Sequence, residues 1–166
     1  PMANVPDGVL AIQSRLFPGM CYAVERLPNP TQHFNCHAWA FGFVTPEALD
    51  GPVDDWVDRQ IDDPSLGGDG DHSIEWSDFE GKLRKGGYDR SANCGFEPGK
   101  EKIALYGDRS SIRPRHSART AYDPEAAEAG FFESKEGEGK IAVHRPEDMA
   151  GETYGPLDSC WARASG

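Results

Sequence analysis

Cys36 is the residue whose type and context best suit covalent chemistry. It follows Asn35, a residue type that commonly caps helix N-termini, and it precedes a short apolar run. We therefore expect Cys36 to open a short helix that ends near Gly42. The N–H groups at a helix start favour the thiolate form of a cysteine, and a thiolate with a nearby base can attack a carbonyl carbon. The alternative is that Cys36 packs as an ordinary small apolar residue.

A base for this thiol would have to be one of the five histidines. We expect His33 and His37, close to the cysteine in sequence, at the surface or on a pocket wall, and His72 solvated in an acidic loop. His116 begins a strand-like segment after a basic loop, and His144 ends another. An imidazole on a strand that faces a helix-borne thiol is common in thiol hydrolases, so His116 is predicted to be the base. Its alternative role is that of a strand histidine held by hydrogen bonds.

A third polar group would orient the imidazole, and the next strand-like segment offers two candidates. Glu133 and Ser134 lie on opposite faces of that strand because side chains alternate, so only one of them can face His116. A carboxylate would both orient the ring and stabilise its charged form, which favours Glu133. Ser134 could only orient it, and Lys135 could simply pair with Glu133.

The elements that would position these residues change in character near residue 100. Before it, helices are predicted from Cys36, from Thr45, over 53–61 and over 77–85, the last with Ser77 and Glu80 as a capping pair. After it, strands separated by Gly-, Pro- and Asp-containing turns are predicted. Their sequences are KIALYG, RHSARTA, GFFESK, KIAVH and YGPLDSCWA. This order predicts a single α+β domain over 1–166, with an irregular segment 1–34 and N-terminal helices packed on a mostly antiparallel sheet.

An ordered set of short motifs resembles a bacterial family of papain-like, NlpC-like cysteine hydrolase domains. The segments are NCHAWAFG, EKIALYG, RHSAR, ESKEG, IAVH and YGPL, which together span about residues 35–157. The resemblance implies a papain-like fold with Cys36 as the nucleophile and His116 as the base. Ser134, Lys135 and His144 match recurrent positions of that family to which no role is assigned. The papain family proper is not supported, because Ala38 stands where its nucleophile would be.

Composition limits the partners and the compartment. The chain has 166 residues and a net charge of -11, so binding to nucleic acid or to an anionic membrane surface is not expected. No signal peptide and no membrane span are visible in the sequence. The four cysteines lack metal-ligand spacing, so we interpret them as thiols, with disulfides as the alternative for an exported chain. The Gly- and Asp-rich segment 62–73 lacks a full calcium-loop pattern, and no metal or other cofactor is expected.

These observations favour a cysteine hydrolase that cleaves an amide bond, either a protease or a Gln/Asn deamidase acting on a protein or peptide. Such a domain could be a bacterial toxin or effector, cytoplasmic or secreted without a classical signal peptide. One alternative is a non-catalytic, acidic binding or inhibitory domain on the same scaffold, for which a basic protein would be a suitable partner. The other alternative is a peptidoglycan peptidase.

Overall fold

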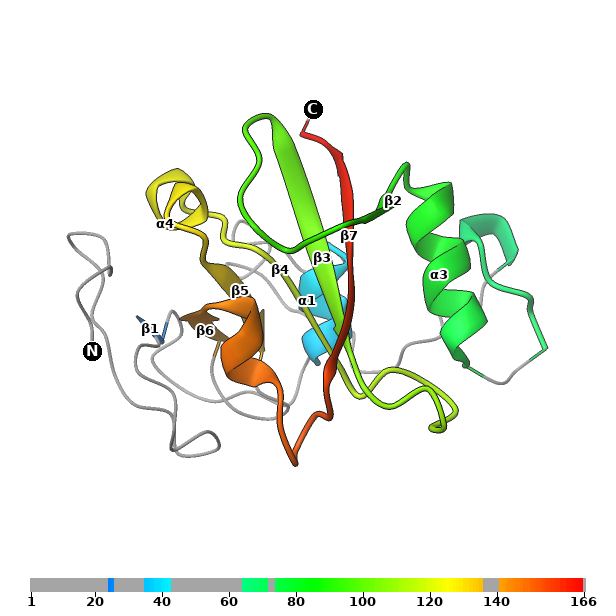
Figure 1. The fold of residues 1–166 in the computed structure, drawn as a ribbon. Helices are drawn as coiled ribbons and strands as arrows, with labels where there is room; N and C mark the ends of the chain where they lie inside the picture. Colours follow the sequence, from blue (N-terminus) through cyan, green and yellow to red (C-terminus); the bar gives the residue numbers. More distant parts are fainter. Residues whose placement is uncertain (1–23, 26–34, 43–63, 72–73, 136–140, 166) are drawn as a thin grey trace, which may run out of the picture.

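A single antiparallel sheet organises the part of the chain that the computed structural model describes, which is residues 24–25, 35–42, 64–71, 74–135 and 141–165. Within these residues the sheet has seven strands in the order β1-β6-β5-β4-β3-β7-β2 (Figure 1). The strands are β1 Val24–Glu25, β2 Asp89–Ser91, β3 Lys100–Tyr106, β4 His116–Thr120, β5 Phe132–Lys135, β6 Ile141–His144 and β7 Leu157–Ala164. The five strands expected after residue 100 are thus confirmed, and the short edge strands β1 and β2 were not foreseen.

Alternating side chains of strand β3 belong to two separate clusters of buried residues, one on each face of the sheet. Ile103 and Leu105 pack on one face with the apolar residues of α3, Trp76–Lys85. Ala104 and Tyr106 pack on the opposite face with Met149 of the 3-10 turn η3, Pro146–Met149. Because both faces are covered, β3 is an almost continuous apolar run from Ile103 to Tyr106.

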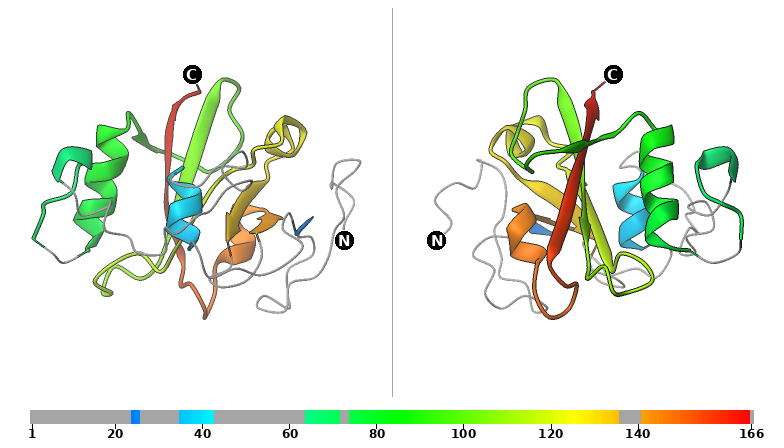
Figure 2. Two further views of the ribbon diagram at one scale, coloured as in Figure 1. Left: turned by 180° about the vertical axis from the view of Figure 1, so that it is seen from behind. Right: turned by 45° about the vertical axis from the view of Figure 1, so that its right-hand side comes forward.

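The helices are short and lie at different places around the sheet. The helix α1, Cys36–Ala40, and the turn η3 cover opposite faces (Figures 1 and 2). The helix α3 lies beside α1, and α4, Pro124–Glu128, connects β4 to β5. Its proline in the first turn follows the capping residue Asp123. None of the described helices is long and apolar enough to cross a membrane.

The start of α3 differs from the sequence prediction in the residues that form the capping pair. Glu75 is the N-cap, and it forms the reciprocal capping box with Asp78 instead of the expected Ser77 and Glu80. The Asp78 carboxylate accepts from the backbone N–H of Glu75 at 2.8 Å, and it also accepts from the N–H of Asp69 at 2.9 Å. Asp78 is therefore buried because it ties the preceding loop to the helix.

The expected α+β fold of papain-like or NlpC-like type is wrong. The described residues form a small β-rich domain, whose helices α1 and α4 have five residues each and whose longest helix, α3, has ten. The helices expected from Thr45 and over 53–61 lie outside the described residues. The sheet also takes in β1 from the N-terminal part and β2 from the middle of the chain, which the order of predicted elements did not indicate.

The interpretation of the cysteines as thiols is wrong for one pair. Cys94 and Cys160 form a disulfide, with their Cα atoms 5.4 Å apart and a sequence separation of 66. The register of β2 explains the pairing, because Ser91 lies opposite Cys160 on β7 and Cys94 follows Ser91 closely. Among the described residues Cys36 is the free cysteine, and Cys21 lies outside them.

Candidate active site

The helix α1 buries Cys36 and His37 side by side against the sheet. As predicted, Asn35 caps this helix, and its side-chain oxygen accepts from the N–H of Ala38 at 2.9 Å. All five residues of α1 are buried, and Cys36 itself is 7% exposed. A helix this short is not stable alone, so its position depends on contacts with the strands β4 and β5 beneath it.

His116, the predicted base, begins β4 and is completely buried. Its ring stacks on Tyr154 with 3.8 Å between ring centroids and an angle of 2° between the planes. Tyr106, which lies opposite it on β3, has its ring centroid 5.3 Å away. Both ring nitrogens of His116 lack a hydrogen-bond partner among the described residues. Neither nitrogen is therefore held by a hydrogen bond of normal geometry to another described residue.

Cys36 and His116 lie near enough to interact electrostatically, although neither ring nitrogen of His116 has a hydrogen bond of normal geometry in the described part of the chain. Burial would raise the pKa of the Cys36 thiol, but the charges of His37 and His116 and their side-chain contacts hold it well below its ordinary value. The thiolate is the reactive form of a cysteine. Cys36 therefore combines a nucleophilic atom with two imidazoles, and the catalytic roles assigned to Cys36 and His116 stay predictions.

A break in the sheet lies where these residues meet. β4 and β5 pair at two positions, Arg119 with Glu133 and Thr120 with Phe132. β3 follows β4 as far as His116, whereas the ladder to β5 ends before it reaches that residue. Since α1 packs against both strands, this opening lets a cysteine on one face approach a histidine whose ring packs on the other.

His37 is a member of the site that sequence reasoning missed. We expected it at the surface or on a pocket wall, but it is 5% exposed. Its Nδ1 lies 2.7 Å from the Oγ of Ser117 on β4, and its ring meets the edge of Phe79 with centroids 4.7 Å apart. The available signal was its place directly after Cys36 in the capped helix. The other neighbouring histidine, His33, and the loop histidine, His72, lie outside the described residues.

Glu133 makes no hydrogen bond to His116, contrary to the expectation that it would orient the ring. Its carboxylate is fully buried and accepts from Trp39 Nε1 at 3.1 Å and from the backbone N–H of Tyr122 at 2.6 Å. Glu133 therefore anchors α1 to the sheet. The strand alternation that separated Glu133 from Ser134 was right, but it puts Glu133 on the face of α1 and not on the face where the His116 ring packs.

Ser134 makes no hydrogen bond to His116 either, because its partner is His144. The Ser134 Oγ lies 2.7 Å from His144 Nε2, and His144 Nδ1 lies 2.8 Å from the carbonyl oxygen of Arg145. A carbonyl only accepts, so Nδ1 carries the proton and the Ser134 hydroxyl donates to Nε2. Burial, together with the charge of nearby His116, lowers the pKa of His144 to about 3, against the hydrogen bond to Arg145. His144 is therefore a neutral neighbour of His116.

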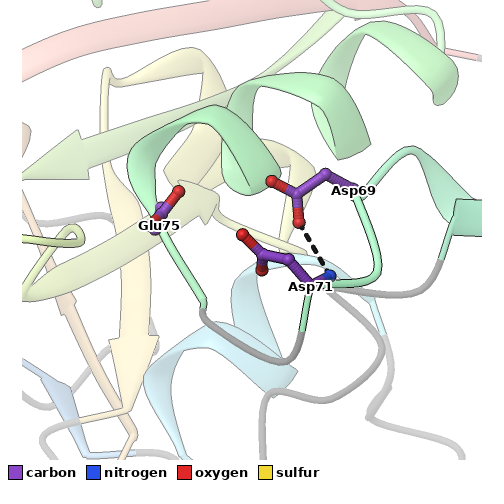
Figure 3. A group of neighbouring side chains, drawn as sticks. All are labelled: Asp69, Asp71 and Glu75. Carbon is purple, nitrogen blue, oxygen red and sulfur yellow. Dashed lines mark hydrogen bonds between the residues drawn. The ribbon is translucent and has the colours of Figure 1, made fainter.

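Three carboxylates gather in the loop before α3, within and just after the segment considered for calcium. Oxygen atoms of Asp69, Asp71 and Glu75 lie within 4.8 Å of one another (Figure 3). The N–H of Asp71 donates to Asp69 at 3.2 Å, and the loop packs on α3 so closely that a Cβ at Gly81 would lie 2.1 Å from the Gly67 oxygen. The hydrogen bond between Asp71 and Asp69 and the position of Glu75 at the N-cap of α3 place these carboxylates near one another.

The fold and site together define a small β-rich domain with a buried thiol between two imidazoles. A family model described as a domain of unknown function, DUF7689, matches residues 27–160. The chain therefore belongs to the DUF7689 family, and the match covers Cys36, His116 and both disulfide cysteines. No curated protein and no solved structure matches the chain.

Proposed function

We propose that this domain is a cysteine hydrolase that cleaves an amide bond in a protein or peptide, with Cys36 as the nucleophile. The observation that carries the proposal is the placement of a free, buried cysteine at the start of a capped helix, with His37 next to it in α1 and with His116 near enough to help lower the pKa of the thiol. Nucleophilic cysteines in hydrolases depend on this kind of activation by an imidazole. The carbonyl carbon of a peptide bond or of a Gln or Asn side chain is the matching electrophile.

The reaction begins when His116 takes the proton from Cys36 Sγ and the sulfur attacks the carbonyl carbon. His116 then gives the proton to the leaving nitrogen, the C–N bond breaks, and an acyl-thioester remains on Cys36. Water, losing a proton to His116, attacks the thioester, and the proton returns to the sulfur as the carboxylic acid leaves. The unpartnered nitrogens of His116 among the described residues suit this repeated transfer, because no hydrogen bond has to break first.

Glu133 and the Ser134–His144 pair would act as positioning residues. Glu133 holds α1, and with it Cys36, through Trp39. His144 stays neutral next to His116, so it does not oppose a positive charge on that ring. Neither role requires contact with the substrate.

The disulfide supports a chain that matures in an oxidising compartment. Structural disulfides form and persist mainly in exported proteins, so the Cys94–Cys160 bond favours a secreted effector over a cytoplasmic enzyme. The same observation favours a peptidoglycan peptidase as the second candidate, because that enzyme acts outside the cytoplasm. An acidic binding domain without catalysis is the remaining alternative.

The test compares cells that express the protein with cells that express Cys36→Ala or His116→Gln. We expect peptides with new N-termini for a protease, or Gln or Asn converted to the acid for a deamidase, and both changes should disappear in the two variants. Ser77→Ala, an exposed change on α3, serves as the control that keeps activity. Purified peptidoglycan, digested in parallel, tests the second candidate.

Two outcomes would count against the proposal. If Cys36→Ala cells show the same protein changes as cells with the unaltered protein, Cys36 is not the nucleophile. If neither proteins nor peptidoglycan change in the presence of unaltered protein that circular dichroism shows to be folded, the hydrolase proposal is overturned.

A further inference from the structure

His37 and Ser117 form a buried polar pair that the reaction described above does not use. The two residues come from different elements, α1 and β4, and are 80 positions apart in sequence. Both are at least nine-tenths buried, and their polar atoms are 2.7 Å apart. His37 directly follows Cys36 in α1, so this pair fixes an imidazole beside the sulfur.

The pairing with a hydroxyl is compatible with a charged imidazole as well as with a neutral one. A serine hydroxyl can donate to Nδ1 of a neutral ring or accept from Nδ1–H of a protonated one. A hydrogen bond that an imidazolium can donate stabilises its charged form. His116 has no comparable acceptor in the described part of the chain, since both of its nitrogens lack a hydrogen bond. The two imidazoles near Cys36 are therefore held in different ways.

The other charged groups on the strands that pack against α1 differ in what they contact. On β4, Arg119 lies 3.8 Å from a Glu101 oxygen and over the Tyr122 ring. On β5, Glu133 accepts from Trp39 and Tyr122, and Lys135 is a fully buried cation on the same face as Glu133. Lys135 is therefore a competing source of positive charge that the test has to include.

We propose that His37 is a second catalytic residue, a protonated imidazole held by Ser117 that stabilises the Cys36 thiolate while His116 moves the proton. His37 keeps its own proton throughout, with Nδ1–H donating to Ser117. The Cys36 Sγ–H bond breaks and its proton passes to His116, as in the proposed hydrolysis. The charge on His37 then disfavours return of the proton to sulfur before His116 has delivered it to the leaving nitrogen. Ser117 acts through His37 and is a positioning residue.

This inference rests on the proposed function for its use in catalysis, but its test needs no substrate. Iodoacetamide alkylates the thiolate form of cysteine, so the rate at Cys36, followed by mass spectrometry against pH, reports the ionisation of the thiol. The disulfide protects Cys94 and Cys160 from the reagent.

We expect the midpoint of this pH profile to rise in His37→Gln, so that alkylation at a pH below both midpoints slows about tenfold for every pH unit by which the midpoint rises. Ser117→Ala, which removes a single oxygen atom, should move the midpoint in the same direction by less. His116→Gln should retain part of the low midpoint because His37 remains. Lys135→Met should leave the midpoint where it is in the unaltered protein.

The possible results distinguish the role of His37 from a role of Lys135 and from the hydrolase function itself. An unchanged midpoint in folded His37→Gln and Ser117→Ala overturns the role of His37, and a higher midpoint in Lys135→Met alone assigns the charge to that lysine. If His37→Gln fails to fold, Ser117→Ala decides between the same results. The midpoint could rise in His37→Gln although the unaltered protein hydrolyses nothing. That result would support the effect of His37 on the Cys36 thiol and would refute the proposed hydrolase activity.

Discussion

Buried polar side chains are concentrated around Cys36, and each histidine there is in a different state. His37 is bonded to a hydroxyl, His116 has no hydrogen bond among the described residues, and His144 has both nitrogens engaged. Buried polar groups cost free energy unless they are hydrogen-bonded. His116 is the exception in this group. Its burial without a hydrogen bond to another described residue lowers the stability of the folded protein, and this happens at the residue that is proposed to be the base.

The neutral state of His144 predicts how stability depends on pH. An unfolded histidine has a pKa near 6.5, whereas folding lowers the pKa of His144 to about 3. Between these values the unfolded chain binds a proton that the folded chain does not. The stability that this group contributes is therefore complete above about pH 6.5 and is lost as the pH falls towards 3, with a slope of about 1.4 kcal/mol per pH unit.

Urea unfolding at pH 7 and pH 5 measures this effect, with His144→Gln as the matched variant. From pH 7 to pH 5, we expect the free energy of unfolding to fall by about 2 kcal/mol more in the unaltered protein than in His144→Gln. Equal pH dependence in the two proteins would show that His144 is not the group that titrates.

At the scale of elements, the docking of α1 decides whether a site exists. Its five residues lie over the place where β4 and β5 separate, and two side-chain bonds connect the helix to these strands. One joins His37 to Ser117 and the other joins Trp39 to Glu133. The position of α1, and with it that of Cys36, therefore depends on how β4 and β5 separate beneath the helix.

Glu133→Gln tests this anchor. A glutamine side chain offers one acceptor and one donor, so either the Trp39 N–H or the Tyr122 N–H loses its buried acceptor. We expect the free energy of unfolding to fall by about 1–3 kcal/mol, as for other buried groups left unpaired. Alkylation of Cys36 at pH 8, where ionisation limits it least, should become faster because α1 is held less firmly.

Trp39→Phe is the matched control, since it removes the same hydrogen bond from the helix side. If Glu133→Gln is as stable as the unaltered protein, the hydrogen bonds of Glu133 do not contribute to the free energy of unfolding. If its alkylation midpoint changes as in His116→Gln, Glu133 acts on the histidine after all.

For the whole molecule, the main covalent constraint among the described residues is the disulfide, which joins two cysteines 66 positions apart in sequence. It connects the loop after β2 to β7, the strand between β3 and the edge strand β2. The buried ammonium of Lys102, on β3, donates to two groups of the same loop, Glu97 at 2.8 Å and the Asn93 carbonyl at 3.0 Å. The loop is therefore held both covalently and by a buried charge.

Removing the disulfide should destabilise the domain without changing its site. For Cys94→Ala/Cys160→Ala, or for the protein in dithiothreitol, we expect the free energy of unfolding to fall by about 2–5 kcal/mol, because a cross-link over a long segment restricts the unfolded chain. Thermal unfolding with and without reductant measures this loss. A melting temperature that does not respond to reductant would contradict the pairing of Cys94 with Cys160.

Local patterns in the sequence determined the features that depend on near neighbours. These are the cap at Asn35 with the helix start at Cys36, and the five turn-bounded strands after residue 100. Each follows from residues a few positions apart, whose backbone preferences act whatever the rest of the chain does. The same patterns singled out Cys36 and His116.

Only the tertiary structure decided which side chains meet. The partners of His37 and of Glu133 are 80 and 94 positions away, and the disulfide joins residues 66 positions apart. Such pairs depend on strand order and register, and a shift of one residue would move every side chain of a strand to the other face. The sequence did not reveal that register, so the fold class, the anchoring role of Glu133 and the second imidazole at Cys36 emerged only from the folded chain.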